Sequence, residues 1–213
     1  MTRARRGRLV AIEGIDGAGK SSLVPRLAGA LRRKGWSVVC RREPADPVLG
    51  ALAQRASVRD PWTGGVYFTV DRHLARPALE RALDRADVVL TDRSLYSTLA
   101  YQGSALPSAE RRRLAELQRR ATVVPDEVVL LDLRPREAVR RVGGRSGARG
   151  PLERERRLAR VAAAYRALAR QRRWVVVDAS RPPTEVAREA ARRLDGRLRA
   201  RRRFGARGRR PRT

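Results

Sequence analysis

The chain has 213 residues, a length that suits one folded domain with short extensions. It carries 50 Lys and Arg against 22 Asp and Glu, which gives a net charge of +28. The single histidine, His73, excludes histidine-based triads and most zinc sites, and the single Cys40 excludes an internal disulfide. No apolar run approaches about 18 residues and no signal-peptide core appears, so we expect a cytoplasmic protein with no membrane contact.

Basic residues gather at both ends of the chain. Residues 197–213 hold nine Arg and residues 1–8 hold four, with no acid in either segment. We therefore expect a basic extension over 1–7, one domain over 8–196, and a basic, disordered tail over 197–213 that binds polyanions without sequence preference. Because 48 of the 50 basic residues are Arg, a general arginine bias weakens charge as evidence for nucleic-acid binding.

The first expected strand, at 8–13, is followed directly by the segment GIDGAGKS, which fits the phosphate-loop pattern G-x-x-x-x-G-K-[ST]. Glycines leave backbone N–H groups open to phosphate oxygens, and a helix near 20–34 would place its N-terminus behind them. Lys20 is expected to reach the β- and γ-phosphates of ATP, and the Ser21 hydroxyl to hold Mg²⁺. The predicted ATP-binding residues are Gly14, Ile15, Asp16, Gly17, Ala18, Gly19, Lys20, Ser21 and Ser22.

Beyond this loop the pattern alternates strand and helix. We expect further strands at 37–42, 87–91, 127–133 and 173–178, and helices near 47–57, 71–86, 107–121, 135–142, 153–172 and 183–202. Continuous apolar strands such as Val128–Leu131 are typical of a parallel sheet covered on both faces. The sequence predicts an α/β, P-loop NTPase fold: a five-stranded parallel sheet flanked by helices, with a short Arg-rich lid. Cys40, within the second expected strand, is interpreted as a buried strand residue.

Polar residues follow the third expected strand, at the edge where ligands collect in such sheets. Asp92 is positioned to orient Mg²⁺ or its water, although an aspartate there can also simply cap the next helix. The guanidinium of Arg93 suits the phosphate of an acceptor nucleotide, because its forked donors bind phosphate bidentately.

Several separated motifs carry a resemblance to a known family. They are the phosphate loop with Glu13 before it, Arg42-Glu43-Pro44, FTVDR at 68–72, Asp92-Arg93 with STLAYQG at 97–103, Pro125-Asp126 with LDL at 131–133, and VDAS at 177–180. In these motifs the chain resembles the thymidylate kinase family, from about residue 8 to about residue 195.

The resemblance implies ATP-dependent phosphorylation of dTMP to dTDP, with ATP and Mg²⁺ as cofactors, and leaves a homodimer open. It implies that Phe68 stacks on thymine, that Arg72 hydrogen-bonds the edge of the base, and that Arg93 grips the acceptor phosphate. The implied substrate-binding residues are Asp16, Phe68, Arg72, Arg93, Thr98, Tyr101 and Gln102, with Tyr101 excluding a ribose 2′-hydroxyl. His73 is expected to be an exposed helix residue.

Two departures from the family pattern stand out. Ala45-Asp46 replaces the glycine pair that follows Arg42-Glu43-Pro44, so the loop there must follow a different path. The lid region, from about Gly143 to Glu155, is shortened and lacks a clear DR.E signature. In addition, some family members carry an arginine in the phosphate loop where this chain has Gly17, and we expect lid arginines to supply that charge. The expected catalytic residues are Lys20, Asp16, Arg93, Arg145 and Arg149, with Arg154 or Arg156 as the next lid candidates. The alternative is a solvated loop whose arginines follow the general bias of the chain.

Two other functions remain open from the sequence. A deoxynucleoside kinase would phosphorylate a hydroxyl and would use a strand-end glutamate such as Glu43 as base. A basic nucleic-acid-binding protein with a degenerate NTPase fold is the other, but every phosphate-loop residue that the chemistry needs is present and only nine aromatic residues occur in the chain.

Overall fold

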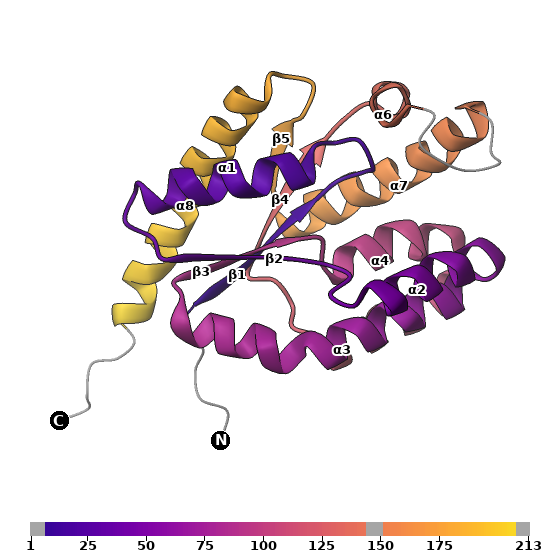
Figure 1. Ribbon diagram of the computed structural model, residues 1–213, viewed down its shortest axis with the longest axis horizontal. Coiled ribbons are helices and arrows are strands. Elements are labelled where there is room, and N and C mark those ends of the chain that lie inside the picture. Colours follow the sequence, from indigo (N-terminus) through magenta and orange to yellow (C-terminus); the bar gives the residue numbers. More distant parts are fainter. Residues whose placement is uncertain (1–6, 144–150, 208–213) are drawn as a thin grey trace.

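The computed structural model describes residues 7–143 and 151–207. Five parallel strands form one sheet in the order β2-β3-β1-β4-β5, as Figure 1 shows. Their bounds are β1 Arg8–Glu13, β2 Val38–Arg42, β3 Val88–Asp92, β4 Glu127–Asp132 and β5 Val175–Asp178. The expected α/β fold with a five-stranded parallel sheet is confirmed.

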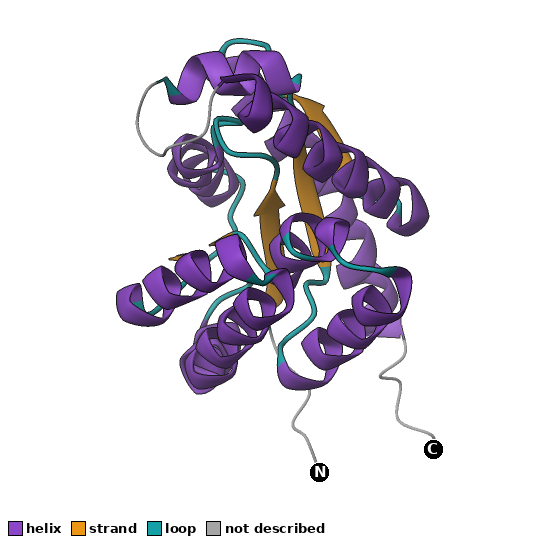
Figure 2. Ribbon diagram, turned by 90° about the vertical axis from the view of Figure 1, so that its right-hand side faces the viewer, coloured by secondary structure: helices purple, strands orange, loops and turns teal. Residues whose placement is uncertain are grey.

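Helices cover both faces of the sheet. In chain order they are α1 Lys20–Arg32, α2 Pro47–Arg59, α3 Pro61–Arg85, α4 Leu95–Tyr101, α5 Ser108–Ala121, α6 Pro135–Val142, α7 Pro151–Arg172 and α8 Pro183–Arg207, with a short 3₁₀ turn at Gly103–Ala105. Helices α1 and α8 pack together on one face, and α3, α4 and α7 lie on the other (Figures 1 and 2). Because the inner strands are covered on both sides, side chains such as Val10, Val88 and Val129 have no exposed surface.

The strand register brings the polar strand ends to one edge. Ile12 of β1 lies beside Asp92 of β3 and Val129 of β4. The phosphate loop that follows β1 is therefore flanked by Asp92 and by the chain leaving β4, at the carboxyl edge of a parallel sheet.

Helix α3 begins ten residues earlier than expected, at Pro61 instead of near residue 71. The Asp60 carboxylate accepts hydrogen bonds from the backbone N–H groups of Trp62 (3.1 Å) and Thr63 (2.9 Å), and Pro61 suits the first helical position because it has no N–H to satisfy. Helix α4 was not expected; Ser94 caps it by accepting from the backbone N–H of Tyr96.

Strand β2 lies at the edge of the sheet and pairs only with β3. Cys40 on this strand is exposed, so the interpretation of Cys40 as a buried residue is wrong. An edge strand has covering neighbours on one side only, which leaves part of its outer surface in solvent.

Helix α8, expected near 183–202, runs from Pro183 to Arg207 and so continues beyond residue 196, where we placed the end of the domain. Leu198 is buried in the core cluster, and Arg197 and Arg201 both form ion pairs with the buried carboxylate of Glu127. These contacts extend the folded part into the segment expected to be disordered. None of the helices within 7–143 and 151–207 is long and apolar enough to cross a membrane.

Candidate active site

The phosphate loop leaves β1 and enters α1 through backbone conformations that favour glycine. Gly14, Gly17 and Gly19 have φ values of 148°, 84° and 92°. A Cβ atom at Gly17 would also lie 2.7 Å from the carbonyl oxygen of Ala138 in α6. No side chain fits there unless α6 moves, which is a physical reason why this chain lacks the loop arginine of some family members.

Lys20 lies at the start of α1, and its ammonium group points into the phosphate loop. Its Nζ donates to the backbone oxygens of Gly14 (2.9 Å) and Ile15 (3.0 Å). Burial, reinforced by the charge of Arg93, lowers the pKa of Lys20 to about 8, although nearby carboxylates oppose this shift. The loop thus holds a mobile cation in the position from which it can turn toward phosphate oxygens.

Ser21 and Asp92 meet beside this loop, which fits a magnesium site. The Ser21 hydroxyl donates to Asp92 Oδ2 at 2.6 Å, whereas Asp92 Oδ1 is buried and has no hydrogen-bond partner. A buried carboxylate oxygen without a partner is costly, and a hard cation with oxygen ligands would satisfy it. The described residues contain no cluster of three or more His, Cys, Asp or Glu side chains that could hold a metal ion. Mg²⁺ is usually held by one or two protein groups plus phosphates and water.

Arg93, Asp16 and Tyr101 form a second group on the other side of the loop. Arg93 Nη2 donates to Asp16 Oδ1 at 2.5 Å, and its guanidinium lies 5.4 Å from the centre of the Tyr101 ring. The Tyr101 hydroxyl accepts the backbone N–H of Asp16 at 2.8 Å. Burial alone would raise the pKa of Asp16, but the charges of Arg93 and Lys20 outweigh it and the pKa falls below 3.8. Asp16 is therefore an anion at neutral pH, and Arg93 a cation.

The backbone of Arg93 is itself unusual. Its φ of 76° lies in the left-handed region that a residue with a Cβ rarely adopts, and its N–H donates to the oxygen of Ile12 at 3.1 Å. Such strain costs on the order of 1–3 kcal/mol and is commonly found at functional sites. It turns the side chain of Arg93 toward the phosphate loop instead of along the sheet.

Glu13 is a functional-site residue whose role the sequence did not reveal. Its carboxylate is fully buried and accepts hydrogen bonds from Ser94 (2.6 Å), Ser97 (2.7 Å) and Tyr165 (2.8 Å). These donors come from the cap of α4, from α4 and from α7. The signal that could have revealed its role is a glutamate at the end of an otherwise apolar strand, directly before the phosphate loop.

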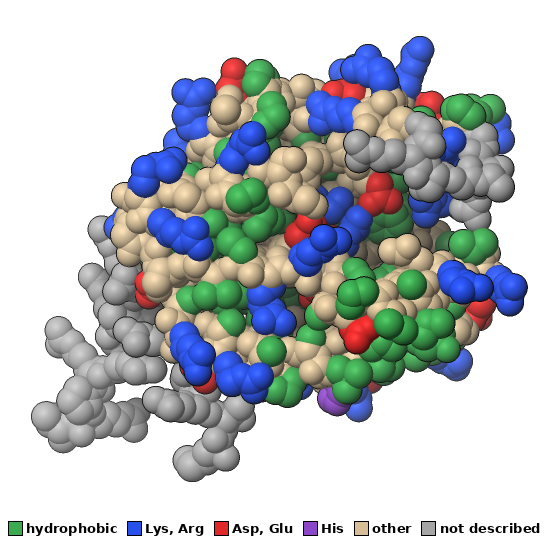
Figure 3. All heavy atoms as spheres, in the orientation of Figure 1, with side chains coloured by type: hydrophobic (Ala, Val, Ile, Leu, Met, Phe, Trp, Pro, Cys, Tyr) green, Lys and Arg blue, Asp and Glu red, His purple; other side chains and the backbone are tan. Residues whose placement is uncertain are grey.

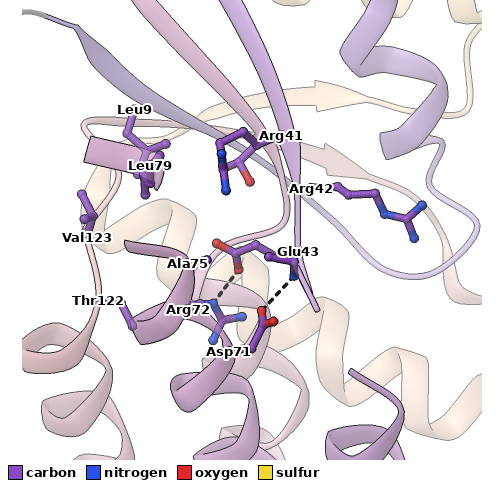
Figure 4. A pocket seen from close by; sticks show the side chains of 12 residues that line it. Leu9, Arg41, Arg42, Glu43, Asp71, Arg72, Ala75, Leu79, Thr122 and Val123 are labelled. Carbon is purple, nitrogen blue, oxygen red and sulfur yellow. Dashed lines mark hydrogen bonds and ion pairs between the residues drawn. The ribbon is translucent and has the colours of Figure 1, made fainter. Parts of the chain in front are cut away.

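Arg72 is buried and donates four hydrogen bonds to other groups of the protein. Its Nε donates to Glu43 at 2.5 Å, as Figure 4 shows. The other nitrogens donate to Thr98 Oγ1 (2.9 Å), Gln118 Oε1 (3.1 Å) and the oxygen of Ser94 (2.9 Å). Since a guanidinium has five N–H groups, these contacts within the described chain leave one for a base edge.

The remaining expected acceptor residues lie on the same side. Phe68 is half-buried, 6.0 Å from the guanidinium of Arg72, and Gln102 donates to the hydroxyl of Ser57 at 3.1 Å. His73 is exposed, as expected. The structure thus gathers Phe68, Arg72, Thr98, Tyr101 and Gln102 on α3 and α4, beside Arg93.

Asp71 fixes the altered loop after Pro44. Its two carboxylate oxygens accept the backbone N–H groups of Ala45 (3.0 Å) and Asp46 (2.8 Å). Figure 4 shows Asp71 beside Arg72. The small cavity in that view has a volume of about 30 Å³ and can hold one or two waters but not a base. A base must therefore lie outside it.

A larger pocket of about 420 Å³ opens at the carboxyl ends of β4 and β5. It is lined by Asp132, Leu133, Arg134, Glu137, Arg166, Asp178 and Ser180. Arg166 binds Asp132 there through its Nε, at 3.0 and 3.1 Å. Of the lid candidates, Arg145 and Arg149 lie outside the described residues, and their role stays a prediction.

Comparisons with known proteins identify the family of this chain. The family model described as thymidylate kinase matches residues 12–190. The thymidylate kinase of Leifsonia xyli is 40% identical over 91% of this chain and 97% of its own length. The probable thymidylate kinase of Methanosarcina barkeri is 34% identical over 89% of this chain and 96% of its own length. The thymidylate kinase of Desulfovibrio desulfuricans is 36% identical over 90% of this chain and 97% of its own length. The chain belongs to the thymidylate kinase family.

Proposed function

We propose that this protein transfers the γ-phosphoryl group of ATP to the phosphate of dTMP, giving ADP and dTDP. The observation that carries the proposal is the pairing of a complete phosphate loop with the Arg93–Asp16 group directly beside it. One side suits the phosphates of a donor, and the other suits the phosphate of an acceptor.

On the donor side, Lys20 exchanges its bonds to Gly14 and Ile15 for phosphate oxygens of ATP. Ser21 and Asp92 would hold Mg²⁺ directly or through water, and this ion would neutralise charge on the β- and γ-phosphates. The nucleoside of ATP is assigned to the pocket at the ends of β4 and β5, because that pocket opens at the same edge of the sheet.

On the acceptor side, Arg93 binds the phosphate of dTMP. Burial tends to lower the pKa of Arg93, but Tyr101 and Asp16 raise it well above its ordinary value, so this guanidinium stays charged. The acceptor phosphate is itself the nucleophile, so catalysis is a matter of positioning and charge neutralisation and requires no general base. Arg93, Asp16 and Lys20 supply that positioning.

A deoxynucleoside kinase is not favoured, because it would need Glu43 as a free base. Burial raises the pKa of Glu43, but its carboxylate is engaged by Arg72 at 2.5 Å, and that cation opposes the shift. A coupled ADP-release assay with ATP and Mg²⁺ tests the choice, using dTMP, dUMP, thymidine and deoxycytidine as acceptors. We expect dTMP to be preferred. Rapid turnover of thymidine with none of dTMP would favour the nucleoside kinase.

A homodimer is the assembly that this chain supports best. Helices α2 and α3 pack against each other and expose large apolar side chains at Val48, Leu52, Val58, Val70 and Leu74. Figure 3 shows hydrophobic side chains gathered over these helices. A second copy of the chain would cover them. Leu74→Glu should shift the protein to monomers in light scattering, whereas Leu152→Glu, at an exposed leucine on α7, should leave its mass unchanged.

The basic C-terminal segment is assigned non-specific polyanion binding, supported by its nine Arg and lack of acids over 197–213. The protein is assigned to the cytoplasm. Both assignments rest on sequence composition.

A further inference from the structure

Two buried side-chain atoms in the described part of the chain have no hydrogen-bond partner, Asp92 Oδ1 and Arg157 Nε. Nearly all buried polar groups in folded proteins are satisfied, so each exception calls for a cause. Asp92 has one, since it lies where the metal is expected. Arg157 is half-buried and has no role among the contacts given above, so the unmet donor at its buried Nε has no explanation within the described chain.

Arg157 lies in the second turn of α7, close to the acceptor side of the phosphate loop. Its guanidinium lies 5.8 Å from the centre of the Tyr101 ring, the same ring that Arg93 approaches at 5.4 Å. The Tyr101 hydroxyl in turn accepts the backbone N–H of Asp16. Two guanidinium groups and the phosphate loop thus converge on one tyrosine.

Helix α7 is held firmly enough to position this arginine. Two turns further on, Tyr165 of the same helix donates to Glu13 at the end of β1, and its ring packs edge-on against Tyr101 at 6.3 Å. The side chain of Arg157 therefore projects from a helix that is tied to the phosphate loop.

The charges around Tyr101 are unbalanced. Arg93 has Asp16 as its counterion, whereas no carboxylate of the described residues pairs with Arg157. A leucine or methionine would pack against Tyr101 without leaving a buried N–H donor unmet, so packing alone gives no reason for an arginine. An anion arriving between the two guanidinium groups would satisfy both.

We propose that Arg157 is a second ligand of the acceptor phosphate and binds it together with Arg93. The inference rests on the proposed function and adds to it a residue that no motif of the family resemblance includes. A phosphate dianion has enough oxygens to accept hydrogen bonds from both guanidinium groups. Charge-assisted hydrogen bonds of this kind are stronger than those between neutral groups.

The test compares Arg157→Met with Arg160→Met, which removes the same charge from an exposed position of the same helix. Dissociation constants for dTMP and for thymidine are measured by calorimetry without ATP, together with the melting temperature. Arg157→Met should weaken dTMP binding by about 10- to 100-fold and leave thymidine binding unchanged, because only dTMP carries the phosphate. Its ligand-free melting temperature should not fall, because the buried Nε that is removed has no hydrogen-bond partner in the described chain. Arg160→Met should match the wild type in all three.

Arg157→Lys keeps the positive charge but loses the bidentate hydrogen bonding of a guanidinium, so it should show a smaller loss of dTMP affinity than Arg157→Met. The same variant tests the inference if Arg157→Met folds poorly. Unchanged dTMP affinity in both variants would overturn the inference, as would an equal loss for thymidine. If wild-type protein itself fails to bind and phosphorylate dTMP, the proposed function fails instead, and the two failures are distinct.

Discussion

Ion pairs occur at both ends of the central sheet, but the two ends differ in how completely their buried polar atoms are paired. At the amino edge, the carboxylate of Glu127 is paired with both Arg197 (3.0 Å) and Arg201 (2.7 Å), and Asp126 pairs with Arg8. At the carboxyl edge, the two buried side-chain atoms without partners in the described chain, on Asp92 and Arg157, lie around the phosphate loop. Paired charges stabilise the folded chain, whereas buried polar atoms without a partner indicate a place where a ligand binds.

The contrast also separates function from the arginine bias of the chain. Arginines occur at both edges, so their number identifies neither as the site. What identifies the carboxyl edge is a lysine bonded only to backbone oxygens, a carboxylate with a free oxygen and a guanidinium without a counterion. Each prediction below tests this difference between the edges.

The largest effect is expected at Lys20. Lys20→Ala removes the cation aimed at the transferring group, so kcat should fall by roughly 10²–10³ or more while the fold is retained. Steady-state kinetics at saturating ATP and dTMP measure this. A variant with near-normal kcat would mean that Lys20 is not the cation that acts on the transferring group.

Arg93→Ala should act on the acceptor. Loss of a charge-assisted fork to phosphate should weaken dTMP binding by about 10- to 100-fold and change ATP binding little. Titration of each nucleotide separately checks this. Unchanged saturation by dTMP would contradict the assignment of Arg93 to the acceptor phosphate.

The sequence was sufficient to predict those parts of the site whose residues lie close together along the chain. The loop around Lys20 and the pair Asp92-Arg93 follow directly from strand, turn and helix patterns. The network of Glu13 and the position of Arg157 could not be predicted, because they depend on α7 packing against α4 and β1 across long sequence separations. Periodicity indicates which face of a helix is buried, but not which residue it meets.

Arg72 illustrates the same limit. The motif FTVDR pointed to this arginine, and the family resemblance gave it a contact with the base. The structure adds four bonds to protein groups, two of them from α4 and α5, elements whose packing against α3 no local pattern encodes. Helix α4 itself was missed, because a short buried helix of seven residues leaves little periodic signal.

The affinity for ATP should depend on pH through Lys20. In the free enzyme burial holds the pKa of Lys20 at about 8, and bound polyphosphate would raise it. Above that pH, binding must take up a proton, so affinity should weaken toward a limit of about tenfold per pH unit. Calorimetry in several buffers from about pH 7 to about pH 9.5 measures the slope and the proton uptake. A flat profile would show that Lys20 stays charged in the free enzyme.

Glu127→Gln should affect stability and leave catalysis intact. The change leaves Arg197 and Arg201 without their shared counterion, and because both arginines are partly exposed the cost should be about 1–3 kcal/mol. Urea unfolding measures it, with kcat measured alongside. A marked drop in kcat in fully folded protein would mean that the amino edge is coupled to the reaction.

The smallest effect on catalysis is expected from deleting 203–213. The deletion keeps Leu198, which is buried in the core, and Arg201, which binds Glu127. These contacts of α8 therefore remain, and kinase activity and melting temperature should match the full chain. What the deletion removes is five arginines and no acid, so retention on heparin or single-stranded DNA should fall, most clearly at low salt. A matched control replaces the same arginines by glutamine, which separates charge from chain length. Loss of kinase activity in the deletion alone would place part of the fold beyond Arg201, and loss in both would connect these charges to nucleotide binding.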